Sequence, residues 1–368
     1  MAHKINFFSE DIILSSQIGD IIIDVDGDFV DISISSSNRN IFLQRFYPFN
    51  GQVTLFDVAS LIEDEMKLNN SSFEEFTISA FSDHIENKSD SRIIRVGFCS
   101  YSIKSFSRFD LIHDSFLSPL TVRRVPAAFS FPIFYFVQPG FSRSYSVNYN
   151  FRLIEDDSII NGSFFLKLPD ASVYGVESIP VSCEEILRDI FMTYNLRAEQ
   201  VQILSLSVNV QDREFSCFVD DSLNYQPIFF FKNCFNVWDW CCVPVVSTAV
   251  TNIESSSASI LNVSIQYDKN YIRSYQVESG PITVDEAECF EQMFVSHFAG
   301  FFADGFNSMD DSSLFWPIIF TDTTCEIYDG DNKVNTMKFT YRFSDNRPIL
   351  RYEDTSGIFS FHFNFAFS

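Results

Sequence analysis

Three aspartates at alternate positions, Asp24, Asp26 and Asp28, are the residues whose types and spacing most resemble a metal site. With Gly27 they begin like a calcium-binding loop, in which carboxylate oxygens at alternate positions act as ligands. The twelfth position is Ser35, where such a loop has a glutamate, and the flanking residues are strand-like instead of helical. We therefore interpret Asp26-Gly27 as the tight turn of a β-hairpin, with weak calcium binding as the alternative.

The cysteines and histidines lack the spacing of a metal or catalytic centre. The sequence has 8 cysteines with no C-x-x-C pair, and adjacent Cys241 and Cys242 would point to opposite faces of a strand. Buried, reduced thiols are expected. The histidines are scattered over different predicted elements: His3, His84, His113, His297 and His362. We expect neither a resident metal nor a cofactor.

Paired carboxylates are the remaining catalytic candidates, because glycoside hydrolases use two acidic side chains. Such groups occur at Glu155-Asp156-Asp157, Asp220-Asp221 and Asp310-Asp311, but a chain with 49 acidic residues is expected to have them in loops. The sequence contains no motif of zinc proteases, serine hydrolases or nucleotide-binding loops. We expect that the protein is not an enzyme, with an acidic β-fold hydrolase as the least favoured reading.

The net charge limits the partners. The formal charge is -24, from 49 acidic and 25 basic residues, whereas binding to a phosphate backbone requires basic residues. We expect no sequence-specific contact with nucleic acid. The 46% hydrophobic content, with 44 Phe, supplies ample apolar surface for a folded core. The N-terminal segment lacks the uninterrupted apolar core of a secretory signal, so folding in the cytoplasm is expected.

The segment Phe229–Val245, FFFKNCFNVWDWCCVPV, is among the most apolar in the chain. Lys232 and Asp239 lie inside it, so it is too polar to be a membrane helix, and we expect no membrane contact. We predict two consecutive buried strands here, Phe229 to Phe231 and Val237 to Val245.

Apolar and polar residues alternate along most of the chain, for example in VQILSLSVNV and TMKFTYRF. This period predicts a mainly β protein made of tandem antiparallel β-sandwich modules, each with a short α-helix. One helix is predicted to begin at Asp57. The other two are predicted to begin with capping boxes, Ser182 with Glu185 and Thr283 with Glu286.

Polar, turn-rich stretches near Glu86–Ser91 and Asp220–Pro227 suit module boundaries. The segments Val53–Met66 and Ile179–Met192 align without a gap, each as an apolar triplet, a cap and a short amphipathic helix. We therefore interpret the second module as a possible repeat of the first. The predicted modules are residues 1–90, 91–222 and 223–368.

Aromatic residues, mostly Phe, are the main candidates for contacts. A Phe side chain buries apolar area but has no hydrogen-bonding group. Its abundance therefore indicates cores and subunit contacts more than sugar binding. The candidate interface or core aromatics are Phe229, Phe230, Phe231, Trp238, Trp240, Phe290 and Phe294.

A series of motifs follows from residue 228 onward. They are Ile228–Asn233 with Phe235, Val237–Trp240, ASILNVSIQY, Ser274–Gly280, a helix ending at Met293–Ser296, Trp316–Thr321 and Met337–Phe343. This order resembles the C-terminal region of tail or baseplate-associated structural proteins in phages and prophages of gut Bacteroidetes, with Asn236 where those proteins have glycine. The segments DIIIDVDGDFVDISIS and GQVTLFDVASLI are similar to the opening module of such proteins.

The resemblance implies a structural protein of the virion tail, folded in the bacterial host cytoplasm, with no catalytic residues. Its partners would be copies of itself in a ring-like homo-oligomer and other phage tail proteins, with exposed Phe patches joining subunits. The acidic surface could line an inner channel through which DNA passes. The alternative is a β-sandwich adhesin that binds carbohydrate or a cell surface through exposed Trp or Tyr side chains and calcium at Asp24 to Asp28.

Overall fold

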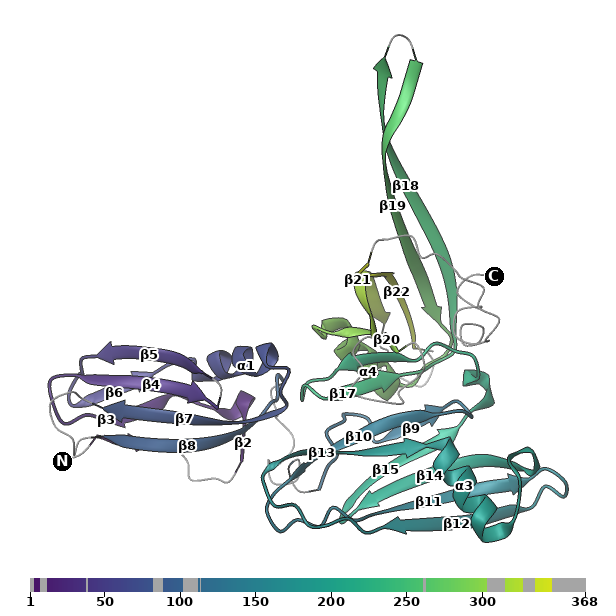
Figure 1. Ribbon diagram of the computed structural model, residues 1–368, viewed down its shortest axis with the longest axis horizontal. Coiled ribbons are helices and arrows are strands. Elements are labelled where there is room, and N and C mark those ends of the chain that lie inside the picture. The colour runs from purple at the N-terminus through teal and green to yellow at the C-terminus, as the bar shows by residue number, and fades with distance from the viewer. Residues whose placement is uncertain are drawn as a thin grey trace.

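The computed structural model describes residues 3–6, 12–37, 39–81, 89–101, 112, 114–260, 263–302, 315–326 and 335–345. Over these residues the protein is mainly β, as predicted, with several antiparallel sheets and three α-helices. Figure 1 shows a first module at one end, a second module below the centre, and a third module from which a long hairpin projects. No helix among the described residues is long and apolar enough to cross a membrane.

The first module packs a three-stranded sheet against a five-stranded one. Buried aliphatic residues such as Ile23, Ile32 and Ile78 fill the space between the sheets. The small sheet has the order β1 (Lys4–Asn6), β3 (Ile21–Asp24) and β6 (Gln52–Leu55). The large sheet has the order β2 (Ile13–Leu14), β8 (Asp90–Gly97), β7 (Phe73–Phe81), β4 (Val30–Ser36) and β5 (Asn40–Phe46). Helix α1 (Val58–Leu68) connects β6 to β7.

The second module has a two-stranded and a five-stranded sheet around an aromatic core that includes Phe131, Tyr149 and Phe215. The small sheet pairs β10 (Ser130–Val137) with β13 (Gly175–Ser182). The large sheet has the order β12 (Ile159–Leu166), β11 (Tyr145–Leu153), β14 (Val201–Val210), β15 (Arg213–Val219) and β9 (Val122–Val125). Helix α3 (Cys183–Tyr194) connects β13 to β14.

These two modules have equivalent topologies. The order β5-β4-β7-β8-β2 in the first large sheet corresponds to β12-β11-β14-β15-β9 in the second. In each sheet the last strand of that order is the parallel one, β2 beside β8 and β9 beside β15. The small sheets pair β3 with β6 and β10 with β13, and a helix follows β6 and β13 alike. The two segments that align in the sequence therefore occupy equivalent places.

The third module is a seven-stranded sheet with one helix, α4 (Val284–Val295), packed against it. The strands have the order β17 (Trp238–Cys241), β16 (Phe229–Lys232), β20 (Ala299–Phe302), β21 (Phe315–Glu326), β22 (Thr336–Phe343), β19 (Val263–Ser279) and β18 (Val245–Ile260). The run ASILNVSIQY, predicted as one strand, is divided between β18 and β19.

The helix ends test the capping predictions. Thr283 with Glu286 forms the predicted reciprocal capping box. Ser182 caps its helix, as predicted, by accepting a hydrogen bond from the Glu185 backbone N–H, but the structure gives no return bond from the Glu185 side chain that would complete the predicted box. Asp57 lies at the predicted start of α1, but its side chain does not cap the helix, because it has φ of 56° and its carboxylate accepts from the Ser60 hydroxyl.

The hairpin predicted at Asp26-Gly27 is also wrong. Strand β3 before the turn pairs with β1 and β6, whereas β4 after it pairs with β5 and β7. The segment therefore crosses from one sheet of the sandwich to the other, which local sequence signals do not distinguish from a hairpin. The module boundary predicted at residue 90 cuts strand β8, which is part of the first module through Gly97.

Candidate functional sites: a buried junction and an exposed arm

The β16–β17 hairpin, which contains most of the predicted aromatic residues, lies between the second and third modules. Strand alternation sends neighbouring side chains to opposite faces. Phe230 and Trp240 pack into the core of the second module, where the Trp240 ring centroid is 4.7 Å from that of Phe131. Phe229 and Phe231 pack into the core of the third module. Both predicted buried strands are present, but the second is shorter than predicted, because β17 ends at Cys241 and Val245 begins β18. The hairpin packs into two modules and holds them together.

Helix α4 packs on the third-module side of this hairpin. Phe290 is buried there, with its ring centroid 6.4 Å from that of Phe229, and Phe294 is half-buried against Phe339 at 5.3 Å. Trp238 is half-buried beside Phe298 and Phe315. The predicted aromatics are thus packed inside one chain, and the two most exposed Phe side chains among the described residues, Phe49 at 81% and Phe56 at 73%, lie in the first module.

The turn that joins β16 to β17 contacts the first module. The Asn236 side-chain amide donates to the Ser71 carbonyl at 2.8 Å, and the Ser100 backbone N–H donates to the Cys234 carbonyl at 2.9 Å. Asn236 has φ of 56°, in the left-handed region that Asn tolerates better than most residues. Its side chain therefore makes a contact that glycine at this position would lack.

An apolar cluster surrounds this turn and includes all three modules; we call the turn and cluster the junction. It contains Ile12, Leu14 and Cys99 from the first module, Ile112 and Leu117 from the connecting segment, Phe136 from the second module, and Cys234, Phe235 and Val237 from the turn. Buried apolar contacts of this kind fix the modules relative to one another.

A buried ion pair lies beside the junction. The Arg123 guanidinium contacts the Asp239 carboxylate at 2.6 Å, and both side chains are at most 4% exposed. Arg123 also donates to the backbone carbonyls of Leu120 and Trp240. Asp239 accepts from the Asn233 side chain at 3.1 Å. Burial has the largest single effect on the pKa of Arg123 and lowers it, but the Asp239 charge, its hydrogen bond and the neighbouring groups together raise that pKa above its ordinary value.

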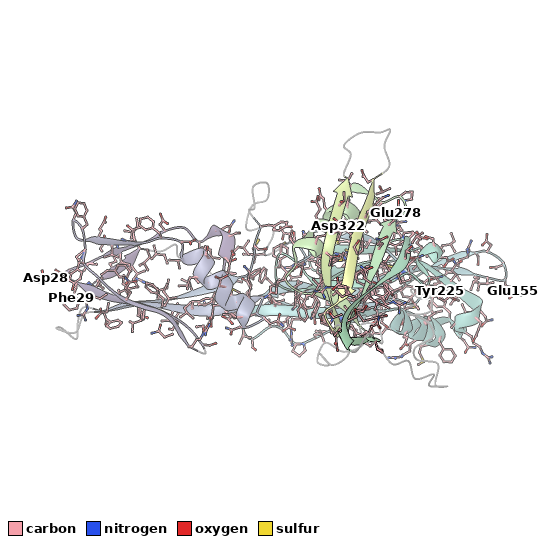
Figure 2. All side chains as sticks on the ribbon, turned by 90° about the horizontal axis from the view of Figure 1, so that it is seen from above. Asp28, Phe29, Glu155, Tyr225, Glu278 and Asp322 are labelled. Carbon is pink, nitrogen blue, oxygen red and sulfur yellow. The ribbon has the colours of Figure 1, made fainter. Side chains whose placement is uncertain are left out.

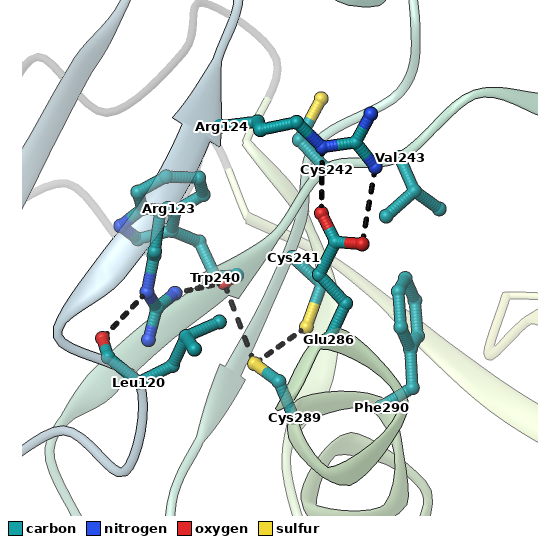
Figure 3. Close-up of a pocket in the computed structure, with 10 residues that line it drawn as sticks. All are labelled: Leu120, Arg123, Arg124, Trp240, Cys241, Cys242, Val243, Glu286, Cys289 and Phe290. Atoms are coloured by element: carbon teal, nitrogen blue, oxygen red, sulfur yellow. Dashed lines mark hydrogen bonds and ion pairs between the residues drawn. The ribbon is translucent and has the colours of Figure 1, made fainter. Parts of the chain in front are cut away.

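A small cavity lies next to this ion pair, between β17 and α4 (Figure 3). Arg124 and Glu286 close one side with paired hydrogen bonds of 2.8 and 3.0 Å. Cys241 and Cys289 line the other side, with their sulfur atoms 3.0 Å apart. The cavity measures about 20 Å³, which is room for roughly one water molecule. It is too small for a substrate.

The thiols at this cavity are poor nucleophiles. Burial raises the pKa of Cys241, and burial raises that of Cys242 to about 12, so both thiols stay protonated at neutral pH. The two side chains point to different cores, as their adjacent positions predicted. Seven described cysteines are free, six of them buried, as expected from the sequence.

The aspartate loop does not gather metal ligands. The Asp24 carboxylate accepts hydrogen bonds from the side-chain amides of Asn6 and Gln52, both at 2.8 Å, and these bonds lower its pKa. Figure 2 shows Asp28 at the far end of the first module. Over the described residues, no group of three or more His, Cys, Asp or Glu could hold a metal ion. His84, His113, His362 and Asp310-Asp311 lie outside them.

Strands β18 and β19 form the second candidate site. Only the base of this hairpin joins the sheet, because β22 pairs with Tyr275–Glu278 of β19. The remainder, residues 250–260 and 263–274, projects as a two-stranded ribbon, which we call the arm (Figure 1). At about 3.4 Å per residue, β18 is roughly 50 Å long. Every side chain from Thr251 to Ala258 is exposed. The sequence prediction missed the arm, because its Ser-rich strands lack a clear apolar alternation.

The fold is a pair of topologically equivalent β-sandwiches, fixed by a junction to a third β-module that carries a projecting arm. No protein-family model and no curated protein matches the chain. The crystal structure of squid arrestin is similar to part of it, with 8% identity over 54% of this chain and 86% of that chain. The TM-score of that match is 0.13, too low to support any statement about fold or function.

Proposed function

We propose that the protein is a structural subunit that assembles through its arm, and that the assembly is a phage virion tail. The arm is the observation that carries the first part of this proposal. The second part depends on the sequence resemblance to tail and baseplate-associated proteins, with a ring at the tail or its connection as the expected form.

The arm has little to stabilise it within one chain. An isolated two-stranded hairpin is marginally stable in water, and stable sheets need a third strand or a packed face. From Thr251 to Ala258 the arm has neither among the described residues, since all these side chains are exposed. Contact with another molecule would supply the missing support, as is usual for arms of oligomeric proteins.

The rest of the molecule is suited to act as a rigid base. The junction fixes three modules through buried apolar contacts and a buried ion pair, so the arm leaves the body in a defined direction. The cavity between β17 and α4 holds about one water molecule. These features support a role in assembly more than one in catalysis.

The absolute mass of the chain in solution, measured by light scattering over a dilution series, tests the proposal. The matched variant replaces residues 251–273 with Asn-Gly, the pair that favours a two-residue hairpin turn. We expect the wild type to form a discrete oligomer, or to assemble when another tail protein is added, and the shortened variant to stay monomeric. Circular dichroism checks that the body still folds. A wild type that remains monomeric with every tail protein contradicts the proposal.

The virion assignment needs its own test. Mass spectrometry of purified particles of a phage that encodes this chain should detect the protein in fixed stoichiometry with known tail proteins. Its absence from the particles would contradict the virion part and leave the assembly part standing.

A further inference from the structure

We infer that the free edge of β18 pairs with β18 of a second copy, in antiparallel orientation, to form a four-stranded ribbon. This rests on the proposed assembly function and names the contact. The occupant is a second copy of this chain, and the paired stretch is Asn252–Ala258.

The backbone of β18 is open for such pairing. Within the described residues, β18 is the outer strand of the seven-stranded sheet and pairs on one side, with β19. Exposed edges are usually protected by charged residues, proline or bulges. Strand β18 has no proline and one charged residue, Glu254, and the one register shift in its pairing leaves the unmatched residue, Tyr267, on β19. Its edge is therefore available for hydrogen bonding to another strand.

Charge favours a second arm as the partner over the body of a second copy. The chain has a formal charge of -24, so two bodies repel each other. In residues 250–274 the acidic residues Glu254 and Asp268 balance the basic residues Lys269 and Arg273. Overlap of seven residues would hold the bodies apart by about 24 Å, at 3.4 Å per residue. That exceeds the Debye length of about 8 Å at physiological salt, so the repulsion is largely screened.

The open edges on the bodies are less suitable. Strand β12 is an outer strand, but the Tyr194 hydroxyl already donates to its Asn161 carbonyl at 3.2 Å. Strand β5 carries Arg45, which pairs with Asp31 at 2.7 Å and is a typical protecting charge. Both strands belong to the acidic body.

The symmetry of the contact defines its register. A two-fold axis perpendicular to the ribbon keeps equivalent side chains on the same face, so one residue must lie opposite its own copy. Pairing Asn252–Ala258 with itself places Ser255 opposite Ser255 of the partner subunit and Glu254 opposite Ser256 of the partner subunit. A centre at Glu254 would instead set two carboxylates directly against each other, so the register centred at Ser255 avoids a directly opposed like-charge pair.

Charge substitution at Ser255 tests this register in the full-length chain. S255E sets Glu against the partner's residue 255, which is then also Glu, and S255K likewise sets Lys against Lys. With about 0.2–1 kcal/mol per cross-strand pair, each variant alone should dimerise more weakly, by up to about fivefold at low salt, and an equimolar mixture of S255E and S255K should favour the mixed dimer, in which the two charges are opposite. Within one arm Ser255 is opposite Lys269, so a purely intramolecular effect has opposite signs for S255E and S255K and gives no preference for the mixed dimer. The control Q266K, on β19, should change the affinity less than twofold.

Spin labels give the geometry independently. In a C183S/C325S background, single cysteines at Thr251, Ser255 and Ala258 accept a nitroxide. The distance between labels in a dimer should be shortest at residue 255 and longer by about 20 Å or more at 251 and 258, from 3.4 Å per residue. An oligomer with a flat distance profile, or with affinity insensitive to Ser255 charge, overturns the inference and leaves the proposed function standing. A chain that stays monomeric with every partner overturns both.

Discussion

The β16–β17 hairpin at the junction and the β18–β19 hairpin of the arm both belong to the third module, and they differ in what determines their conformation. Residues of the β16–β17 hairpin contact segments more than a hundred positions away, such as Leu117 and Ser71. Residues of the arm, such as Ile253, pair with the neighbouring strand and are otherwise exposed. The comparison teaches that contacts within one chain stabilise the first hairpin, whereas the second hairpin needs contacts with another molecule to stabilise it. It predicts that substitutions at the junction affect stability and that substitutions in the arm affect assembly.

The largest effect is expected for D239N, which leaves the buried Arg123 guanidinium without a carboxylate. Loss of one partner of a buried ion pair costs about 3–5 kcal/mol of unfolding free energy. Urea denaturation measures the loss. The control is D157N, which removes an exposed partner of Arg152 and should change stability by less than about 1 kcal/mol. Equal effects of the two substitutions would contradict the structural role of the buried pair.

Next comes the pH dependence due to Lys232. Burial lowers its pKa to about 8 in the folded protein, below the value near 10.4 expected in the unfolded chain. Between these values the unfolded state binds more protons, so this group makes the protein more stable as the pH rises. Relative to K232M, the wild type should gain about 2 kcal/mol of unfolding free energy between pH 8 and pH 10. Taking the difference between the unfolding free energies of the two proteins cancels the contributions of cysteines and tyrosines, because these residues titrate in both. An unfolding free energy of the wild type that falls relative to that of K232M as the pH rises would contradict this account.

Two substitutions of Asn236, in the turn of the junction, separate two contributions of similar size to the unfolding free energy. N236G keeps the positive φ and loses the hydrogen bond to Ser71, at a cost of about 1 kcal/mol. N236A loses the bond and also places alanine in the left-handed region, which adds about 1 kcal/mol or more. Hydrogen exchange at Ser71 and Ser100 should increase in both variants. If exchange there is unchanged, the turn does not hold the first module.

The smallest effect on stability is expected in the arm. Alanine at Thr251, Ile253 or Ser255 should change the unfolding free energy of the monomer by less than about 0.5 kcal/mol, because these side chains are exposed. Chemical denaturation at a concentration below the assembly range measures this. A loss above 1 kcal/mol would show that the arm packs within its own chain and would remove the contrast with the junction.

Local patterns predicted the β class, two of three helix caps and the two buried strands at Phe229–Val245, because alternation and capping boxes act over a few residues. They could not predict which strands pair across the sandwich at Asp26-Gly27. Nor could they predict that Arg123, in the sequence VRRV, pairs with a residue 116 positions later. Its burial depends on a hairpin from another module, and no short pattern encodes that distance.

The position of the junction turn in the chain has a consequence for biosynthesis. The turn, residues 233–237, comes after both sandwiches, and it contacts Ser71 of the first and the connecting residue Leu117. On the ribosome the two sandwiches emerge first and can fold as units. They can be locked together only after this late turn leaves the exit tunnel. A ribosome stalled when residue 223 has left the exit tunnel but residues 233–237 are still inside it would therefore carry two folded but loosely connected domains.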